Sequence, residues 1–249
     1  MPRLPIYHLR SRATPFVVLF IERDGSTYLT SLLASHPQVR VVYERFAVLR
    51  QQGAGAQAQL GWAASYLKPP LVGRAAAIGF KTKLVDVLDR DGFAALLRAR
   101  ACHILLMRRQ NHVKAVVSRI NARRLHDVTG NWNLYDSADR MPPMQVDPAE
   151  FDRYLQERAA AERELQDYVA RLELPTLRLV YEEMLVDRAA ALARVFEFLQ
   201  VRPVALQGRT LKHTPDDLRQ VVLNFDEMVQ LYAGTAYEPM FREVIQEPV

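Results

Sequence analysis

A short polar segment that follows an apolar run has the residue types that bind a phosphate group. The segment Glu22 to Thr27 reads E-R-D-G-S-T and follows the apolar residues 16–21, which have the character of a buried strand. Residues 28–33 then place apolar side chains on one helical face, and His36-Pro37 ends that pattern. The first backbone N–H groups of a helix have no intrahelical partner and lie at the positive end of its dipole. We therefore interpret Arg23, Gly25, Ser26 and Thr27 as a candidate anion-binding loop.

The same segment also has a plain structural interpretation. In an ordinary strand-to-helix connection, Ser26 would only cap the helix. The ATPase pattern G-x-x-x-x-G-K-[ST] is absent, because no lysine precedes Ser26 and the upstream glycine is missing. This absence argues against an ordinary ATPase or kinase.

Lysine is rare in this sequence, so each lysine is informative. Residues 78–83, I-G-F-K-T-K, are typical of a strand that brings Lys81 and Lys83 to its carboxyl end. In an open parallel sheet, ligands bind at that end. We expect one of these two lysines to face the site and the other to be a solvated charge.

An arginine pair and a serine form a second candidate anion site. Residues 103–107 are a predicted strand that ends at Arg108 and Arg109, and apolar residues from 111 to about 124 trace one face of a helix. Ser118 belongs to this helix, so we expect it to lie near the arginine pair. Arginine forms charge-assisted forks with phosphate better than lysine does.

The elements that must position these residues alternate along the chain. Further strands are predicted at 39–43 and 177–180, and helices at 93–100, from 147 to about 172, at 189–199 and after 214. Alternation of this kind predicts an α/β fold in which helices cover both faces of a parallel sheet. The length of 249 residues fits one domain covering 1–249, with a variable cap at about 45–75 and a lid-like loop at about 126–146.

Composition narrows the classes of partner. The net charge of +5 and the isoelectric point near 9.4 suit a polyanionic ligand, but no basic run with interleaved aromatic residues favours nucleic acid. The single cysteine, Cys102, excludes a disulfide within the chain, and the histidines show no metal-ligand spacing. The first residues lack a signal-peptide pattern and no apolar run reaches membrane-spanning length. We expect a cytoplasmic protein without a metal or a membrane span.

Four segments, taken in order, resemble the sulfotransferases that use 3′-phosphoadenosine 5′-phosphosulfate (PAPS). Residues 23–29 look like the 5′-phosphosulfate loop of that family in its bacterial and Golgi-type form, R-x-G-S-[ST]-x-L. Residues 106–122 are similar to its 3′-phosphate motif. Two later segments of the family resemble further parts of this chain. The first resembles residues 179–184, L-V-Y-E-E-M, with residues 195–199, and the second resembles residues 212–227. The matches extend over roughly residues 16–240, and their order makes the combination fairly specific.

The resemblance implies a P-loop-like central parallel sheet in a single domain, with PAPS as cosubstrate, 3′-phosphoadenosine 5′-phosphate (PAP) as product and no metal. It implies that the 5′-phosphosulfate is held by Arg23, Asp24, Gly25, Ser26, Thr27 and Tyr28. The 3′-phosphate would be held by Ser118 with Arg108 or Arg109. The spacing from Arg109 to Ser118 is one residue longer than in the commonest form of the motif. The choice between Arg108 and Arg109 therefore stays open, and we favour Arg109. Tyr181 would lie near the adenine, and Lys212 would reach a phosphate.

The resemblance also implies the catalytic roles. Glu44 matches the glutamate that activates the acceptor hydroxyl in this family, although a surface ion pair with Arg40 or Arg45 is an alternative role. Lys81 or Lys83 would stabilise developing charge, and Arg23 would hold the transferring group. The predicted function is sulfuryl transfer to a hydroxyl of a small-molecule or glycan acceptor. Two alternatives stay open: a nucleotide-binding, P-loop-like phosphotransferase, and a non-catalytic PAPS- or PAP-binding relative. The acceptor and the oligomeric state are not predicted.

Overall fold

A parallel sheet with β1 at its centre organises the chain. The computed structural model describes residues 13–68, 74–206 and 214–245. The five strands follow the order β2-β3-β1-β4-β5, and every neighbouring pair is parallel. They are β1 (Thr14–Leu19), β2 (Val39–Val42), β3 (Ala77–Thr82), β4 (His103–Arg108) and β5 (Thr176–Val180). The predicted α/β fold with a central parallel sheet is therefore confirmed.

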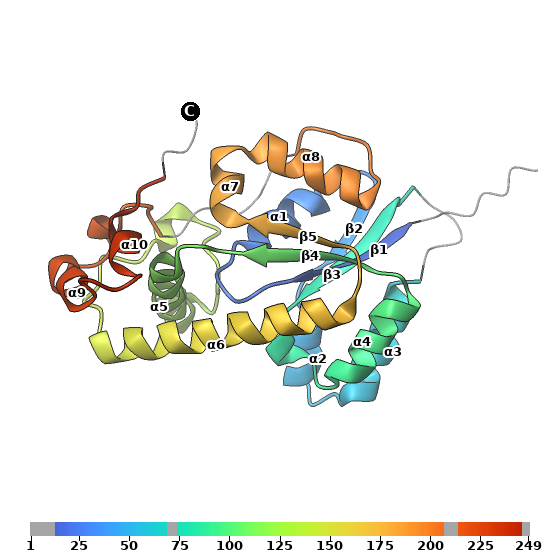
Figure 1. Ribbon diagram of the computed structural model, residues 1–249, viewed down its shortest axis with the longest axis horizontal. Coiled ribbons are helices and arrows are strands. Elements are labelled where there is room, and N and C mark those ends of the chain that lie inside the picture. Colours follow the sequence, from blue (N-terminus) through green and yellow to red (C-terminus); the bar gives the residue numbers. More distant parts are fainter. Residues whose placement is uncertain (1–12, 69–73, 207–213, 246–249) are drawn as a thin grey trace, which may run out of the picture.

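Helices cover both faces of this sheet (Figure 1). One face packs against α1 (Ser26–Ala34) and α8 (Arg188–Leu199), with α7 (Tyr181–Val186) beside them. The other face packs against α2 (Arg45–Gln51), α3 (Ala56–Tyr66), α4 (Arg90–Ala99) and the second half of α6 (Pro148–Leu172). Side chains that alternate along β1 supply both cores, because Phe16 and Val18 belong to the first and Val17 and Leu19 to the second.

A third apolar cluster lies beyond the carboxyl ends of the strands. It is formed by α5 (His112–Thr129), the first half of α6, α9 (Phe225–Leu231) and α10 (Glu238–Arg242). Figure 1 shows these helices grouped at one end of the molecule, past the arrowheads of β4 and β5. Three short 3-10 turns, η1 (Leu84–Asp86), η2 (Ser137–Asp139) and η3 (Leu218–Gln220), complete the elements.

The strand register brings three connections together. Leu19 at the end of β1 lies opposite Thr82 of β3 and Leu106 of β4. The segments that leave β1, β3 and β4 therefore emerge side by side, and they carry the three groups of candidate residues from the sequence.

Several predicted features near the site differ from the structure. Helix α5 continues to Thr129, where Gly130 ends it in a left-handed conformation, so the lid-like loop begins at residue 130 rather than at 126. Of the predicted cap, α2 is the part that lines the site among the residues that the structure describes. Helix α3 packs on the sheet instead, with Trp62 edge-on to Phe80 at 5.0 Å between ring centroids. The helix predicted after 214 is the short turn η3.

Candidate functional site

A cavity of about 430 Å³ opens where the strands end. The loop after β1 and the start of α1 form its floor, and α2 forms one wall. The rest of the lining comes from the turn after β4, Ser118 within α5, the segment after Gly130 and the start of α7. Its lining includes the predicted residues Arg23, Gly25, Ser26, Thr27, Tyr28, Glu44, Lys83, Arg109, Ser118 and Tyr181. Residues that lie far apart in the sequence thus converge on one space.

The loop after β1 presents the start of α1 to this cavity. Gly25 is the N-cap of α1 with φ of 83°, and no side chain caps the helix. The alternative in which Ser26 merely caps the helix is therefore wrong. Arg23 also has a positive φ, 69°, which is uncommon for a residue with a side chain. Because no side chain occupies the N-cap role, the first N–H groups of α1 are left for an anion.

Gly25 is required by a close approach as well as by its backbone conformation. A Cβ atom added to Gly25 would lie 2.3 Å from Cδ2 of Tyr181. The tyrosine ring therefore packs directly over the loop. It also lies under Arg109, whose guanidinium carbon is 5.0 Å from the ring centroid.

Replacing Gly25 by alanine is expected to weaken binding of PAP, the ligand that the sequence resemblance predicts, by more than about tenfold, because the Tyr181 ring must move and the loop with it. Gly53→Ala is the matched control, since Gly53 has φ of 74° but a Cβ added there would meet no atom within 4 Å. The control isolates the backbone cost, about 1–2 kcal/mol in unfolding free energy. Calorimetric titration with PAP and urea unfolding measure the two effects. Equal behaviour of both variants would contradict the assigned role of Gly25.

Asp24 points away from the cavity, which corrects its predicted role in cofactor binding. It is buried and forms an ion pair with Arg158 of α6, while its Oδ2 accepts a hydrogen bond from the Ile21 N–H at 3.0 Å. Arg158 also donates to the carbonyl oxygens of Glu22 and Arg109, each at 3.2 Å. Burial raises the pKa of Asp24 although Arg158 opposes the shift. Asp24 therefore fixes the shape of the loop from behind.

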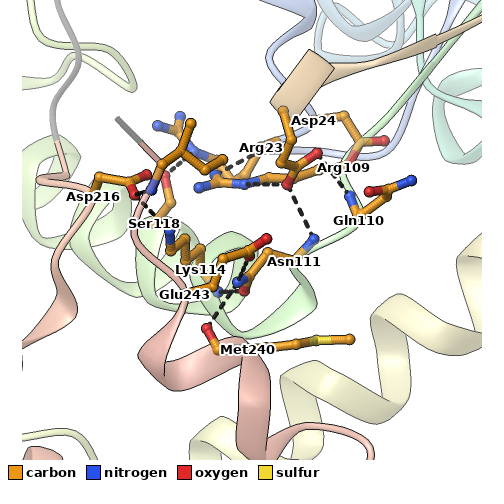
Figure 2. Close-up of polar contacts among 12 residues, drawn as sticks. Arg23, Asp24, Arg109, Gln110, Asn111, Lys114, Ser118, Asp216, Met240 and Glu243 are labelled. Atoms are coloured by element: carbon orange, nitrogen blue, oxygen red, sulfur yellow. Dashed lines mark hydrogen bonds and ion pairs between the residues drawn. The ribbon is translucent and has the colours of Figure 1, made fainter. Parts of the chain in front are cut away.

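Two arginines and a serine that line the cavity lie against one another (Figure 2). Arg23 Nε donates to Ser118 Oγ at 3.0 Å, and Arg109 Nη1 donates to the Arg23 carbonyl at 3.4 Å. Burial and the charge of Arg109 lower the pKa of Arg23 to about 10. Within the described residues Arg23 forms no ion pair, and the carboxylate of Glu182 lies 3.8 Å from Arg109 Nε. Two buried positive charges in this setting favour a bound anion.

Arg108, the other predicted candidate, does not line this cavity. Its side chain pairs with Glu162 of α6, with 2.9 Å between Nε and Oε1. Glu162 also pairs with His112 at 2.9 Å, and these two partners lower its pKa to about 2. The structure thus places Arg109 and Ser118 together and Arg108 apart, in agreement with the preference for Arg109.

Glu182 positions the start of α5, a role that the sequence did not reveal. Its two carboxylate oxygens accept hydrogen bonds from the backbone N–H groups of Gln110 and Asn111, each at 3.0 Å. The side chain of Asn111 in turn caps α5 and donates to the carbonyl of Met240 at 2.8 Å. Figure 2 shows how these contacts connect the turn after β4 with the C-terminal segment.

Lys81 of β3 and Lys83, just past the end of that strand, both pair with Glu44, which lines the cavity. Lys81 Nζ lies 3.0 Å from Glu44 Oε1, and Lys83 Nζ lies 3.6 Å from Oε2. The prediction that one lysine would be a solvated charge is wrong, because residues two apart on a strand share a face. The alternative surface pair of Glu44 with Arg40 or Arg45 is also not observed among the described residues.

Lys81 joins Glu44 to the anion-binding loop. It donates to Thr27 Oγ1 at 2.7 Å and to Ser26 Oγ at 3.4 Å. Its side chain is 1% exposed, and burial lowers its pKa against the opposing pull of Glu44. Glu44 itself is 32% exposed, so water or an acceptor hydroxyl can reach it.

Thr214 and Trp132 also line the cavity, as the sequence prediction for Trp132 allowed. Thr214 lines the cavity with a buried Oγ1 that has no hydrogen-bond partner among the residues described. Trp132, from the segment after Gly130, stacks on His126 with 4.2 Å between ring centroids, and its carbonyl accepts from Arg23 at 3.2 Å. Lys212 lies outside the described residues.

The described residues contain no group of three or more His, Cys, Asp or Glu side chains that could hold a metal ion. Over the same ranges, no helix combines the length and the apolar character that a membrane crossing requires.

Comparison with known proteins gives relatives over nearly the whole chain, although no protein-family model matches. The chain is 26% identical to Nodulation protein H of Rhizobium tropici over 241 residues, which cover 91% of this chain and 92% of that protein. Nodulation protein H of Rhizobium meliloti is 25% identical over 240 residues, covering 91% and 94%. The crystal structure of a sulfotransferase from Alicyclobacillus acidocaldarius superposes with a TM-score of 0.50 at 16% identity, covering 92% of this chain and 96% of that one. At this identity, the likeness concerns the fold.

Proposed function

We propose that this chain, which has the fold of the sulfotransferases, transfers a sulfuryl group from PAPS to a hydroxyl group of a small-molecule or glycan acceptor. The observation that carries the proposal is that two groups of residues meet at this cavity. In the first, Arg109 and Ser118 lie beside Arg23, and in the second, Glu44 pairs with Lys81. The start of α1 also lines the cavity, and its Thr27 accepts a hydrogen bond from Lys81.

The first group, together with the start of α1, suits a ligand that carries two separate phosphates. In this proposal the N–H groups of α1, with Arg23, Ser26 and Thr27, hold the 5′-phosphosulfate, and the support is that these residues line the cavity. Arg109 and Ser118, which line the same cavity, hold the 3′-phosphate. Tyr181 lies over both the loop and Arg109, where its ring offers a surface for the adenine. ATP, whose phosphates form a single chain, matches this two-phosphate clamp less well.

The second group supplies what sulfuryl transfer needs. An acceptor hydroxyl loses its proton to Glu44 while its oxygen bonds to sulfur, and the bond from sulfur to the 5′-phosphate oxygen breaks. Negative charge then accumulates on the departing phosphate. Lys81 contacts both Glu44 and Thr27, so its ammonium group lies between the base and the loop, where this charge develops.

Two other functions use the same residues differently. A phosphotransferase would bind a nucleoside triphosphate in the loop and would not depend on Arg109 and Ser118 for a separate 3′-phosphate. A non-catalytic relative would bind PAP but would show no turnover, so Glu44 would have no catalytic role in it. The two alternatives therefore differ from the proposal in the effects they predict for substitutions at Arg109, Ser118 and Glu44.

Replacing Arg109 by methionine is expected to weaken PAP binding by about 10–100-fold, the effect of losing one charge-assisted contact. Adenosine 5′-phosphosulfate lacks the 3′-phosphate, so its affinity is expected to change by less than about threefold. Arg108→Met is the matched control, because Arg108 pairs with Glu162 away from the cavity. Calorimetric titrations of the three proteins with both ligands measure these effects. An equal loss for both ligands would contradict the assignment of Arg109 to the 3′-phosphate.

A further inference from the structure

A second cavity, of about 280 Å³, lies directly beside the first. The loop after β1, η1, α5 and α6 enclose it. Phe20, Glu22 and Lys83 line both cavities, so these side chains form the wall between them. Neither the motifs of the sequence nor the proposed cofactor site uses this space.

The walls of the second cavity are mostly apolar. Among the side chains that line it are Phe20, Ile21, Leu84, Val116, Tyr154 and Leu165. An apolar lining with a few polar groups at the edge is the usual character of a small-molecule site. The cavity is of a size for one aromatic ring system or a short alkyl chain.

The charged side chains that line this cavity each have an ion-pair partner. Arg119 pairs with Glu22 at 2.6 Å and with Glu157 at 2.8 Å, and it lies 3.9 Å from the centroid of the Tyr154 ring. Arg158 is paired with Asp24. The remaining pairs are Arg90 with Glu164 and Lys83 with Glu44 and Asp86. The first cavity presents excess positive charge, whereas the charges around the second are balanced, so it favours a neutral group.

The wall between the cavities stands next to the proposed base. Lys83 lines the second cavity, and its Nζ is 3.6 Å from Glu44 Oε2. Phe20 lines both cavities, and its ring centroid is 4.9 Å from Lys81 Nζ. A molecule in the second cavity is therefore separated from Glu44 and Lys81 by a single side chain.

We infer that the second cavity binds a neutral apolar part of the acceptor, an aromatic ring or a short alkyl chain, while the acceptor hydroxyl passes Phe20 to reach Glu44. This inference rests on the proposed function and deepens it. It makes the acceptor an alcohol or phenol that carries an apolar group, rather than an unsubstituted sugar.

Filling the cavity tests the inference. Ala161 of α6 lines the second cavity but not the first, and it is half-buried. Ala161→Phe is expected to weaken binding of 2-naphthol to the PAP-loaded protein by at least about tenfold, while PAP affinity stays within about twofold. Ala160→Phe is the matched control, because Ala160 is the exposed neighbour on the same helix. Ala161→Leu, a smaller addition, replaces the phenylalanine variant if that variant lowers the thermal midpoint.

The possible outcomes distinguish a failure of this inference from a failure of the proposed function. Saturable binding of 2-naphthol to the wild-type protein, weakened by the change at Ala161 and not by the change at Ala160, supports the inference. No saturable binding, or equal binding by all variants, overturns it. Failure of the wild-type protein to bind PAP would overturn the proposed function instead. In that case, 2-naphthol binding measured without PAP would still test whether the second cavity binds an apolar group.

Discussion

Replacing Lys81 by methionine is expected to lower the turnover number for sulfuryl transfer by about 10²–10³-fold, the usual cost of removing one preorganised charge-stabilising donor. The ammonium group lies 3.0 Å from Glu44 and 2.7 Å from Thr27 Oγ1, between the base and the loop. Methionine keeps the volume and removes the charge. PAP affinity is expected to fall by less than about tenfold, since Arg23 and the N–H groups of α1 remain.

Lys83→Met is the matched control for this result. Lys83 is 25% exposed, lies farther from Glu44 and is shared with Asp86 at 3.5 Å. Its loss is expected to lower turnover by no more than about tenfold, because water screens a partly exposed charge. Single-turnover measurements with labelled PAPS compare the two variants. A larger loss for Lys83→Met than for Lys81→Met would contradict the role given to Lys81.

Replacing Glu44 by glutamine is expected to lower turnover by about 10²–10⁴-fold, the range for loss of a general base. The amide keeps the shape of the side chain but cannot take the acceptor proton. PAP affinity is expected to stay within about twofold, because Glu44 contacts the lysines rather than the arginines of the phosphate clamp. Parallel measurements of turnover and of PAP binding separate catalysis from binding.

Glu22→Gln controls for the other carboxylate of the first cavity. Glu22 also lines that cavity, but Arg119 holds it at 2.6 Å and it has no ion pair with Lys81 in the parts of the chain that the structure describes. Its replacement is expected to change turnover by less than about tenfold. If Glu22→Gln removed activity and Glu44→Gln kept it, Glu22 rather than Glu44 would be the base.

The features of this molecule that depend on local sequence were predictable. The strand, glycine turn and helix around Gly25 follow from apolar periodicity and from the left-handed conformation that glycine allows. Ser118 lies on the helix that starts just after Arg109, so their proximity could be predicted as well. The common direction of Lys81 and Lys83 was predictable too, because residues two apart on a strand share a face, but the prediction assigned them to different surroundings.

The errors about Asp24 and Arg108 concern contacts made across long separations in the chain. Asp24 has the residue type and position of a ligand, yet its direction is fixed by Arg158, which lies 134 residues away on α6. In the same way, Arg108 lies outside the cavity because it pairs with Glu162, 54 residues away. No periodicity in the sequence indicates which helix packs behind a loop. The second cavity was missed for this reason, since α5 and α6 form much of its wall.

The central claim is tested most directly by titrating the purified protein with PAP and with ATP in a calorimeter. The two-phosphate clamp predicts saturable binding of PAP at about micromolar concentration or tighter, with ATP at least about 100-fold weaker. The result depends on Arg23, Arg109 and Ser118 acting together, and it needs no knowledge of the acceptor. Binding of ATP as tight as that of PAP, or tighter, would contradict the two-phosphate clamp and would favour a nucleotide-dependent phosphotransferase.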